Sequence, residues 1–460
     1  MRRIRGAEVC GVFYDLNPSV VGLQLRQWTE HFPCYLAGAN MLFVPHAGYV
    51  YSGQVAARAY KQLANGPSRR VFMLADNHQR EWATRGVAVP NFDAFQIFDH
   101  QISVDRTFCA DLLEKFPNIF HSTEKAYNGH VIEVHLPMLL HFMENSTISL
   151  VPLVFQGTIE EERRMLAEYL HSRWTDGDLI IISSDLSHYL PAQSAEARDH
   201  ETLAALLSER IPLGENCLCG REALSCAQHI ASRRRWICNF IDYTHSGVNS
   251  SAAARVVGYG ALAWTREAIR FPDDAFIALE KLAMRCIECA LTQVPPPDMD
   301  QLLKQFPQFL VRQSVFVTLM KNGRLRGCIG GLGDFSQTVL DGVQRRAIDA
   351  AFRDSRFPPV TSEELRQLEA HVSILSFPTE LQLPCDRWIE HLSGVNPKPG
   401  IILEIGGRTS TFLPEVWEQI PEPKDFLCAL CRKQGVPEDA WKNPMAKLFL
   451  YTTQTRHELY

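Results

Sequence analysis

Four side chains that can bind a metal ion or transfer a proton each follow a short apolar run of the sequence. They are His46, His78, Asp185 and His188. Two neutral imidazoles with an oxygen or sulfur donor and open coordination positions are typical of non-haem iron sites, and also of zinc and copper sites. A further histidine beside such a site could act as an acid or base near neutral pH. These residues therefore favour a polar or metal site beside which His188 could act as an acid or base.

The elements before these residues must bring them together. Short apolar runs alternate with longer amphipathic stretches as far as residue 265, which predicts an α/β fold with a mostly parallel sheet and helices on both faces. The carboxyl ends of parallel strands meet at one edge of a sheet, so the four side chains would share a crevice there. The expected strands are Met41–Val44, Val71–Ala75, Ile148–Phe155, Leu179–Ser183 and Arg255–Trp264, and the expected helices are Gly53–Ala64, Asp105–Phe116, Val131–Met143, Thr158–Trp174, Ser194–Ser208 and Gly220–Ala231.

A second polar group opens the helix expected over Val131–Met143. His130, Glu133 and His135 are spaced so that some of them could hold the ligand histidines in position by hydrogen bonds. A solvated first helical turn with a favourable acidic charge would also explain Glu133. A single histidine is more often a hydrogen-bonded structural residue than a ligand. It is the grouping of several histidines at successive strand ends that favours a site.

The pattern changes after Trp264, and a domain boundary is expected near residue 268. The first domain would cover residues 1–268 and the second residues 269–460. Asn322-Gly323 lies between two strand-like runs and predicts a hairpin, because both turn positions need positive φ. The second domain is therefore expected to be α+β with antiparallel pairing. Its expected strands are Ser314–Met320, Arg326–Ile329, His371–Phe377, Ile401–Ile405 and Leu448–Tyr451, and its expected helices are Asp273–Gln293, Ser336–Phe352 and Lys424–Gln434.

Composition narrows the class of protein. The chain has 460 residues, of which 46% are hydrophobic and 21% charged, as in ordinary soluble proteins. A net charge of −6 gives no reason to expect a nucleic-acid partner. The sequence shows no secretory signal and no apolar run long enough to span a membrane. Thirteen scattered cysteines suit reduced thiols, so we expect a cytoplasmic protein.

Five segments of the first domain resemble the Memo family, which is structurally similar to class III extradiol dioxygenases. They are VPHAGYVYSG, the histidine after the second strand, EVHLPMLL, SSDLSHY and RVVGYGAL, within roughly residues 8–265. The resemblance implies that His46 and His78 are metal-site histidines and that Asp185 and His188 line the same pocket. It also implies iron or copper binding and redox chemistry for some members, whereas others have been viewed as binding proteins.

The segment YTHSGVNSSAAARVVGY departs from the family pattern. Asn249 stands where the resemblance places a cysteine, and Val248 and Ala252 stand where it places acidic residues. Asn249 is a weak neutral ligand, and His245 could substitute for the missing donor. The expected third ligand is therefore His245 or Asn249, or the site has no third ligand. With this resemblance the hypothesis is a metal held by His46 and His78, with His188 as acid or base and Asp185 as its orienter.

The second domain resembles the AMMECR family over about residues 272–460. The segments that carry the resemblance are GRLRGCIGGL, AAFRDSRFPPVTSEEL, GGRTSTFLPEVW and YTTQTRHE. Arg324 and Arg326 could hold an anion or a partner, since guanidinium groups pair bidentately with oxyanions. Cys328 could be a reactive thiol if these arginines lower its pKa, but a buried packing role on a strand is favoured.

Memo-like and AMMECR-like proteins together resemble the AmmeMemoRadiSam system. That resemblance implies a separate radical S-adenosylmethionine enzyme as partner. We therefore expect a metal-dependent redox protein, with iron favoured over copper or zinc and with a small-molecule or peptide substrate. The alternative is a non-catalytic binding or scaffold protein that recognises a peptide or a modified product.

Overall fold

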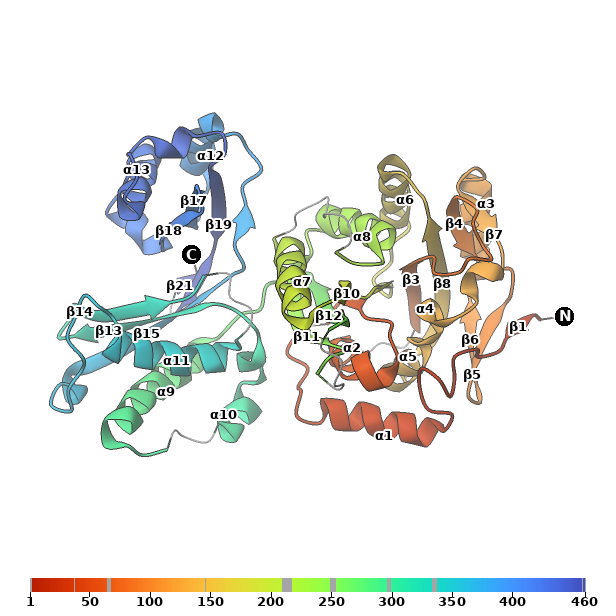
Figure 1. Ribbon diagram of the computed structural model, residues 1–460, viewed down its shortest axis with the longest axis horizontal. Coiled ribbons are helices and arrows are strands. Elements are labelled where there is room, and N and C mark those ends of the chain that lie inside the picture. Colours follow the sequence, from red (N-terminus) through yellow and green to blue (C-terminus); the bar gives the residue numbers. More distant parts are fainter. Residues whose placement is uncertain are drawn as a thin grey trace. The chain divides into compact units, whose positions relative to one another are not determined.

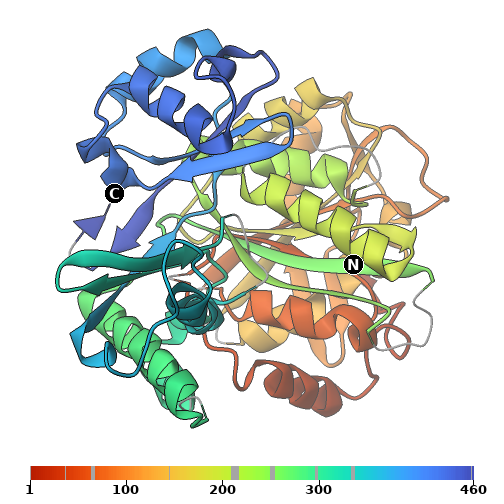
Figure 2. The same cartoon turned by 60° about the vertical axis from the view of Figure 1, so that its left-hand side comes forward.

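The computed structural model describes residues 2–36, 38–63, 68–144, 146–208, 217–248, 254–295, 299–332, 337–456 and 458–459. The chain divides into two compact units, Met1–Ile269 and Arg270–Tyr460. Figures 1 and 2 show their helices and strands, and each unit is described by itself.

The centre of the sheet in the first unit is parallel. Its strands follow the order β6, β8, β3, β9 and β2, and each neighbouring pair is parallel. Two predicted strands, β2 and β9, have the bounds expected from their apolar runs, and both are buried along their whole length. The bounds are β6 His100–Val104, β8 Thr147–Gln156, β3 Ser68–Asp76, β9 Leu179–Ser183 and β2 Met41–Val44.

Antiparallel strands extend this sheet at both ends. β12 pairs with β2 and carries β11 and β10, while β5 pairs with β6 and β4 pairs with β8. β1 and β7 join β5 and β4 in parallel. The predicted α/β class is confirmed, with a mixed sheet whose middle is parallel. The bounds are β1 Ile4–Arg5, β4 Gly86–Val89, β5 Ala94–Ile97, β7 Phe120–Ser122, β10 His188–Leu190, β11 Ile237–His245 and β12 Val256–Thr265.

Helices cover both faces of this sheet, as predicted. Figure 1 shows α6, α7 and α8 on one side of the strands and α1, α2 and α5 on the other. The bounds are α1 Pro18–Thr29, α2 Gln54–Tyr60, α3 Arg106–Lys115, α4 His130–Glu133, α5 Leu136–Phe142, α6 Glu160–Ser172, α7 Ala192–Leu207 and α8 Arg221–Arg234.

The structure corrects one helix prediction and contains helices that the sequence did not predict. The helix expected over Val131–Met143 is two helices, α4 and α5, because Pro137 cannot continue a helix through the carbonyl group of Glu133. Helix α1 was not predicted, although Asn17 caps it by accepting a hydrogen bond from the Ser19 N–H at 2.9 Å.

The second unit contains two antiparallel sheets, which confirms the α+β prediction. The order of the first sheet is β14-β13-β15-β20-β21, with α9 and α11 packed on it. The order of the second is β16-β19-β17-β18, with α13 packed on it. The strands are β13 Val315–Lys321, β14 Arg324–Gly330, β15 Leu368–Leu375, β16 Thr379–Glu380, β17 Gly400–Ile405, β18 Arg408–Phe412, β19 Lys447–Tyr451, β20 Thr453–Thr455 and β21 Glu458–Leu459, and the helices are α9 Asp273–Thr292, α10 Asp300–Gln305, α11 Val339–Phe352, α12 Trp388–Gly394 and α13 Pro423–Gln434.

The predicted hairpin is present between β13 and β14. Asn322 has φ of 49° and Gly323 has φ of 73°, so both turn residues adopt the left-handed conformation that the sequence indicated. Among the helices in the described ranges, none is long and apolar enough to cross a membrane.

Candidate metal centre

Three metal-binding side chains of the first unit lie within reach of a single ion. One donor atom from each of His46, His78 and Cys219 lies within 4.8 Å of the other two. His46 follows β2 and His78 follows β3, and both strands flank β9 in parallel, so their carboxyl ends share one edge of the sheet. Cys219 comes from the segment that leads into α8. The crevice predicted for His46 and His78 therefore contains a cysteine as its third donor.

Hydrogen bonds hold the His46 ring in the tautomer that a metal ligand requires. The Ser183 hydroxyl donates to the Val131 carbonyl oxygen at 2.6 Å, so it must accept from the Nδ1–H of His46, which lies 2.9 Å away. The lone pair is then on Nε2, which lies 3.4 Å from the Cys219 sulfur. The Ser183 hydroxyl thus fixes the tautomer of His46.

The rings of His78 and His188 are oriented in the same way by main-chain carbonyl groups. Nδ1 of His78 is 2.9 Å from the Asp76 oxygen, and Nδ1 of His188 is 2.9 Å from the Leu186 oxygen. A carbonyl oxygen only accepts, so each Nδ1 carries the proton and each Nε2 carries a lone pair. His78 is thereby prepared to bind a cation and His188 to accept a proton.

The segment around Cys219 is held against the end of β9. The Asp185 N–H donates to the Cys219 sulfur at 3.2 Å, and the Gly220 N–H donates to the Ser184 hydroxyl at 2.8 Å. A Cβ on Gly220 would lie 2.7 Å from the Ser184 Cβ, closer than carbon atoms approach. Glycine at this position lets Cys219 reach the two histidines.

Asp76 links two of the three ligands. Its carbonyl oxygen orients His78, while its carboxylate accepts from the Glu222 and Ala223 N–H groups at 3.0 and 2.8 Å. These amides open α8, so the carboxylate fixes the start of the helix that follows Cys219. Burial raises the pKa of Asp76 to about 7.

Asp185 supports His46 through the main chain. Its carboxylate accepts from the His46 N–H at 2.8 Å, and its other oxygen lies 3.8 Å from His46 Nε2. Burial raises the pKa of Asp185 to about 7. The contact that orients the His188 ring comes from Leu186 rather than from Asp185, which was the expected orienter.

Burial keeps the imidazoles of the crevice neutral. The pKa of His46 is lowered well below its usual value, first by burial and then by its neighbours His78, His130 and His135. Burial also lowers the pKa of His130 to about 4 and the pKa of His188 below its ordinary value. Neutral imidazoles are the form that binds metals and accepts protons.

Of the residues expected to hold the ligand histidines, His130 lies beside them, whereas the hydrogen bonds of Glu133 are with the amino-terminal segment. The His130 ring centroid is 5.1 Å from that of His46 and 5.8 Å from that of His78, and the ring stacks on Phe13 at 4.7 Å. Glu133 is buried, and its carboxylate accepts from the amides of residues 8 and 9 and from the Tyr14 hydroxyl. His130 therefore packs against the ligand pair, while Glu133 anchors the amino-terminal segment.

The expected third ligand does not belong to the group of three donors. His245 ends β11, and its Nδ1 accepts from the Gly247 N–H at 3.1 Å. Asn249 lies outside the described residues. Sequence reasoning missed Cys219, although a cysteine followed by glycine directly before an amphipathic helix was a readable signal.

The candidate anion site of the second unit is already occupied by a side chain. Arg326 is buried and donates to the Glu364 carboxylate at 3.1 and 2.9 Å, and Lys321 donates to the same group at 2.7 Å. Arg324 is exposed on the hairpin. The Cys328 thiol is half-buried and accepts from the Thr318 hydroxyl at 3.2 Å. An anion at Arg326 would have to displace Glu364.

The protonation of Cys219 predicts a pH dependence of metal affinity. Burial, and then the Asp185 carboxylate, raise the pKa of this thiol, so it carries a proton that a bound metal must displace. Above pH 7.5 an ordinary imidazole is already neutral. Only the proton of the Cys219 thiol should then compete with the metal. Because the proton concentration falls as the pH rises, the metal should bind more tightly at higher pH. We expect zinc affinity to rise about tenfold from pH 7.5 to 8.5. Competition titration against a chelating dye measures the zinc affinity at each pH. The Cys226→Ala variant should show the same change of affinity with pH as the wild type. A zinc affinity that does not change with pH would contradict Cys219 as a ligand.

Comparisons with known proteins match both halves of the chain. The Memo-like protein family model matches residues 5–263, and the AMMECR1 family model matches residues 280–456. A protein of Methanothermobacter thermautotrophicus is 36% identical over 166 residues, covering 35% of this chain and 81% of that protein.

Several relatives carry the Memo name. Protein MEMO1 of Danio rerio is 30% identical over 191 residues, covering 40% of this chain and 63% of that protein. A MEMO1 family protein of Archaeoglobus fulgidus is 27% identical over 271 residues, covering 56% of this chain and 98% of that protein. The solved structure of the uncharacterized protein PH0010 from Pyrococcus horikoshii is 29% identical, covers 40% of this chain and 92% of that chain, and has a TM-score of 0.36. The chain belongs to the Memo-like protein family and joins a Memo-like domain to an AMMECR1 domain.

Proposed function

We propose that this chain, whose Memo-like domain has an extradiol-dioxygenase-like fold, is a metal-dependent redox protein. The observation that carries the proposal is the group of His46, His78 and Cys219, whose donor atoms lie within 4.8 Å of one another. Hydrogen bonds leave the Nε2 lone pair of each histidine free to bind. Cys219 adds a sulfur donor that becomes a thiolate on metal binding.

The donor set fits a transition metal. Two imidazoles and one thiolate suit iron, copper and zinc, whereas magnesium and calcium prefer oxygen ligands. We favour iron, with copper or zinc as the other candidates. A bound redox-active ion would supply electron transfer and would polarise an oxygen-containing substrate.

His188 is the proposed acid or base. Burial lowers the pKa of His188 below its ordinary value, and the nearby His78 lowers it further, so the His188 ring is neutral. Since its Nδ1–H is held by the Leu186 carbonyl group, Nε2 is the atom that accepts or returns a proton. Asp185 supports this reaction indirectly, by holding the main chain of His46.

Metal-dependent oxygen consumption tests the function. We expect protein loaded anaerobically with iron or copper to consume oxygen in the presence of a reductant, and zinc-loaded protein or a His46→Ala variant to consume none above the buffer rate. The His188→Gln variant should keep its metal and lose about 10²-fold or more of the rate, the usual contribution of a general acid or base. If His46→Ala keeps the wild-type rate, the proposed site is wrong.

The proposed partners are a small-molecule or peptide substrate and a separate radical S-adenosylmethionine enzyme. The fusion of a Memo-like domain with an AMMECR1 domain supports this proposal, because both modules are present in one chain. A reducing cytoplasm suits a protein whose thirteen cysteines are all free thiols. The alternative of a binding or scaffold protein depended on a missing third donor, and Cys219 now supplies one.

A further inference from the structure

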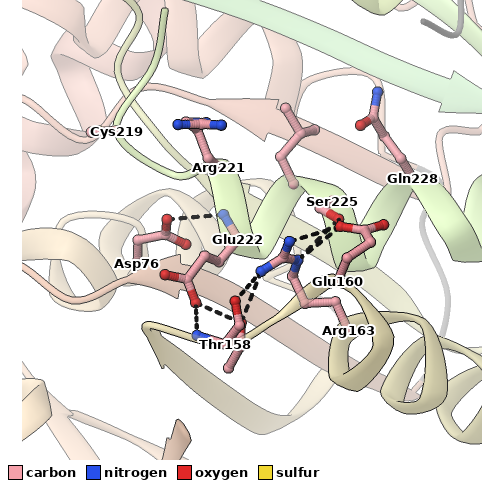
Figure 3. A pocket seen from close by; sticks show the side chains of 10 residues that line it. Asp76, Thr158, Glu160, Arg163, Cys219, Arg221, Glu222, Ser225 and Gln228 are labelled. Atoms are coloured by element: carbon pink, nitrogen blue, oxygen red, sulfur yellow. Dashed lines mark hydrogen bonds and ion pairs between the residues drawn. The ribbon is translucent and has the colours of Figure 1, made fainter. Parts of the chain in front are cut away.

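A cavity of about 320 Å³ lies beside the candidate metal centre, along α8 (Figure 3). Cys219 forms part of its wall, so the cavity and the donor group share this residue. Its volume is at the lower end of the range of small-molecule sites. The lining residues are Asp76, Thr158, Glu160, Arg163, Cys219, Arg221, Glu222, Leu224, Ser225 and Gln228.

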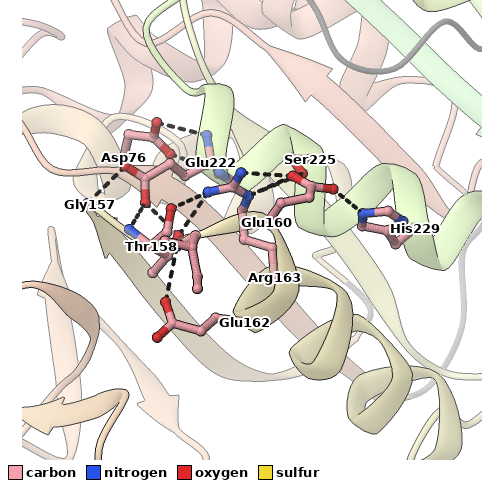
Figure 4. Close-up of polar contacts among 11 residues, drawn as sticks. Asp76, Gly157, Thr158, Glu160, Glu162, Arg163, Glu222, Ser225 and His229 are labelled. Atoms are coloured by element: carbon pink, nitrogen blue, oxygen red, sulfur yellow. Dashed lines mark hydrogen bonds and ion pairs between the residues drawn. The ribbon is translucent and has the colours of Figure 1, made fainter.

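Most of the charged groups that line the cavity already have hydrogen-bond or ion-pair partners in the protein (Figure 4). Arg163 donates to Glu160 at 2.7 Å and to Ser225 at 3.1 Å, and Glu160 also accepts from His229 at 2.5 Å. The Glu222 carboxylate accepts from the amides of residues 157 and 158 at 2.8 and 2.6 Å.

The third carboxylate of the wall is also engaged. Asp76 accepts from two amides at the start of α8. Every carboxylate of the cavity therefore accepts at least two hydrogen bonds from the protein itself. These carboxylates offer little to a cationic ligand.

Two lining side chains of α8 have no hydrogen-bond or ion-pair partner among the described residues. Arg221 is exposed at the first position of the helix, and Gln228 lies two turns further along. Gln228 is only 6% exposed, which is unusual for an amide without a partner. Figure 3 shows both side chains projecting from α8 with no dashed line to a neighbour.

The chemistry of these two groups selects the ligand. A guanidinium group has donors and no acceptor, and it matches the paired oxygens of a carboxylate or phosphate. The amide of Gln228 can donate to a further oxygen or accept from a hydroxyl group.

We propose that this cavity binds a small organic anion, with its carboxylate or phosphate group on Arg221 and a second polar group on Gln228, against Cys219. The site goes beyond the proposed metal chemistry, because neither of the two recognition residues is a metal donor. The anion covers Cys219 from the cavity side. Binding therefore shields this thiol in the metal-free protein.

Calorimetry of the metal-free full chain tests the site with succinate and with inorganic phosphate as probes. We expect one of the two to bind at a single site and Arg221→Gln to weaken its binding at least tenfold. Succinate carries a second carboxylate for Gln228, so Gln228→Leu should weaken succinate binding at least tenfold. Gln228→Glu, which keeps the side-chain size and adds a negative charge, should do the same. Arg235→Gln removes an exposed cation from the far end of α8 and should bind like the wild type.

The bound probe should also slow alkylation of Cys219 by iodoacetamide. The protein is alkylated with and without the probe and then digested, and the modified fraction of the peptide that contains Cys219 is measured. Succinate binding alone identifies a carboxylate ligand, and phosphate binding alone identifies a phosphate ester. The proposal is overturned if neither probe binds the wild type, if Arg221→Gln binds unchanged, or if calcium binds in place of both anions. None of these outcomes depends on metal in the neighbouring centre, so failure here is distinct from failure of the redox function.

Discussion

The Cys219→Ala variant is expected to lose its metal. The wild type should hold about one ion per chain after anaerobic loading and desalting, and the variant should hold less than a tenth of that. Two imidazoles without the thiolate bind far more weakly, because the third donor and its negative charge are both gone. Elemental analysis by mass spectrometry measures the difference. Cys226→Ala is the matched control, since Cys226 is a buried thiol of α8 outside the donor group.

This experiment distinguishes between two assignments of the third metal ligand. The sequence pointed to His245 or Asn249, whereas the structure places the Cys219 sulfur 3.4 Å from His46 Nε2. A Cys219→Ala protein that keeps a full complement of metal, together with a His245→Ala protein that loses it, would return the assignment to His245 at the end of β11.

The Gly327→Ala variant is expected to destabilise the second unit by about 1–3 kcal/mol, the usual range for overpacking a core. Gly327 lies on β14, and a Cβ there would come within 2.3 Å of the Ala350 carbonyl oxygen on α11. Two main-chain segments would have to separate, because no flexible side chain can move aside. Urea denaturation followed by circular dichroism measures the change.

Gly394→Ala is the matched control. Gly394 is the last residue of α12, its φ is ordinary, and a Cβ there meets nothing within 4 Å. Its free energy of unfolding should stay within about 0.5 kcal/mol of the wild type. Equal stability of the two variants would mean that the glycine in the RGCIG segment is not needed for strand–helix packing.

The sequence predicted the parts of the site that local patterns determine. Continuous apolar runs identified β2 and β9, and the rule for parallel strands placed His46 and His78 at one edge of the sheet. The hairpin at Asn322 followed from turn chemistry. These features depend on a few neighbouring residues, so they can be read without the rest of the fold.

Cys219 depended on contacts between distant residues. It belongs to no periodic pattern, and its place is set by the Asp185 amide and by the close approach of Gly220 to Ser184. The break between α4 and α5 shows the opposite case, because Pro137 was visible in the sequence and its effect was overlooked. The resemblance to the Memo family implied a cysteine at the position of Asn249, which lies outside the described residues, whereas the donor group among the described residues contains Cys219.

X-ray absorption of the iron-loaded wild type at the metal edge tests the central claim most directly. A centre built from His46, His78 and Cys219 predicts one sulfur neighbour at about 2.3 Å and two imidazole nitrogens at about 2.0–2.1 Å, as judged from the bond lengths of zinc sites. The metal should be present at about one ion per chain. A spectrum with nitrogen and oxygen neighbours but no sulfur, or a chain that retains no metal under anaerobic conditions, would contradict the account.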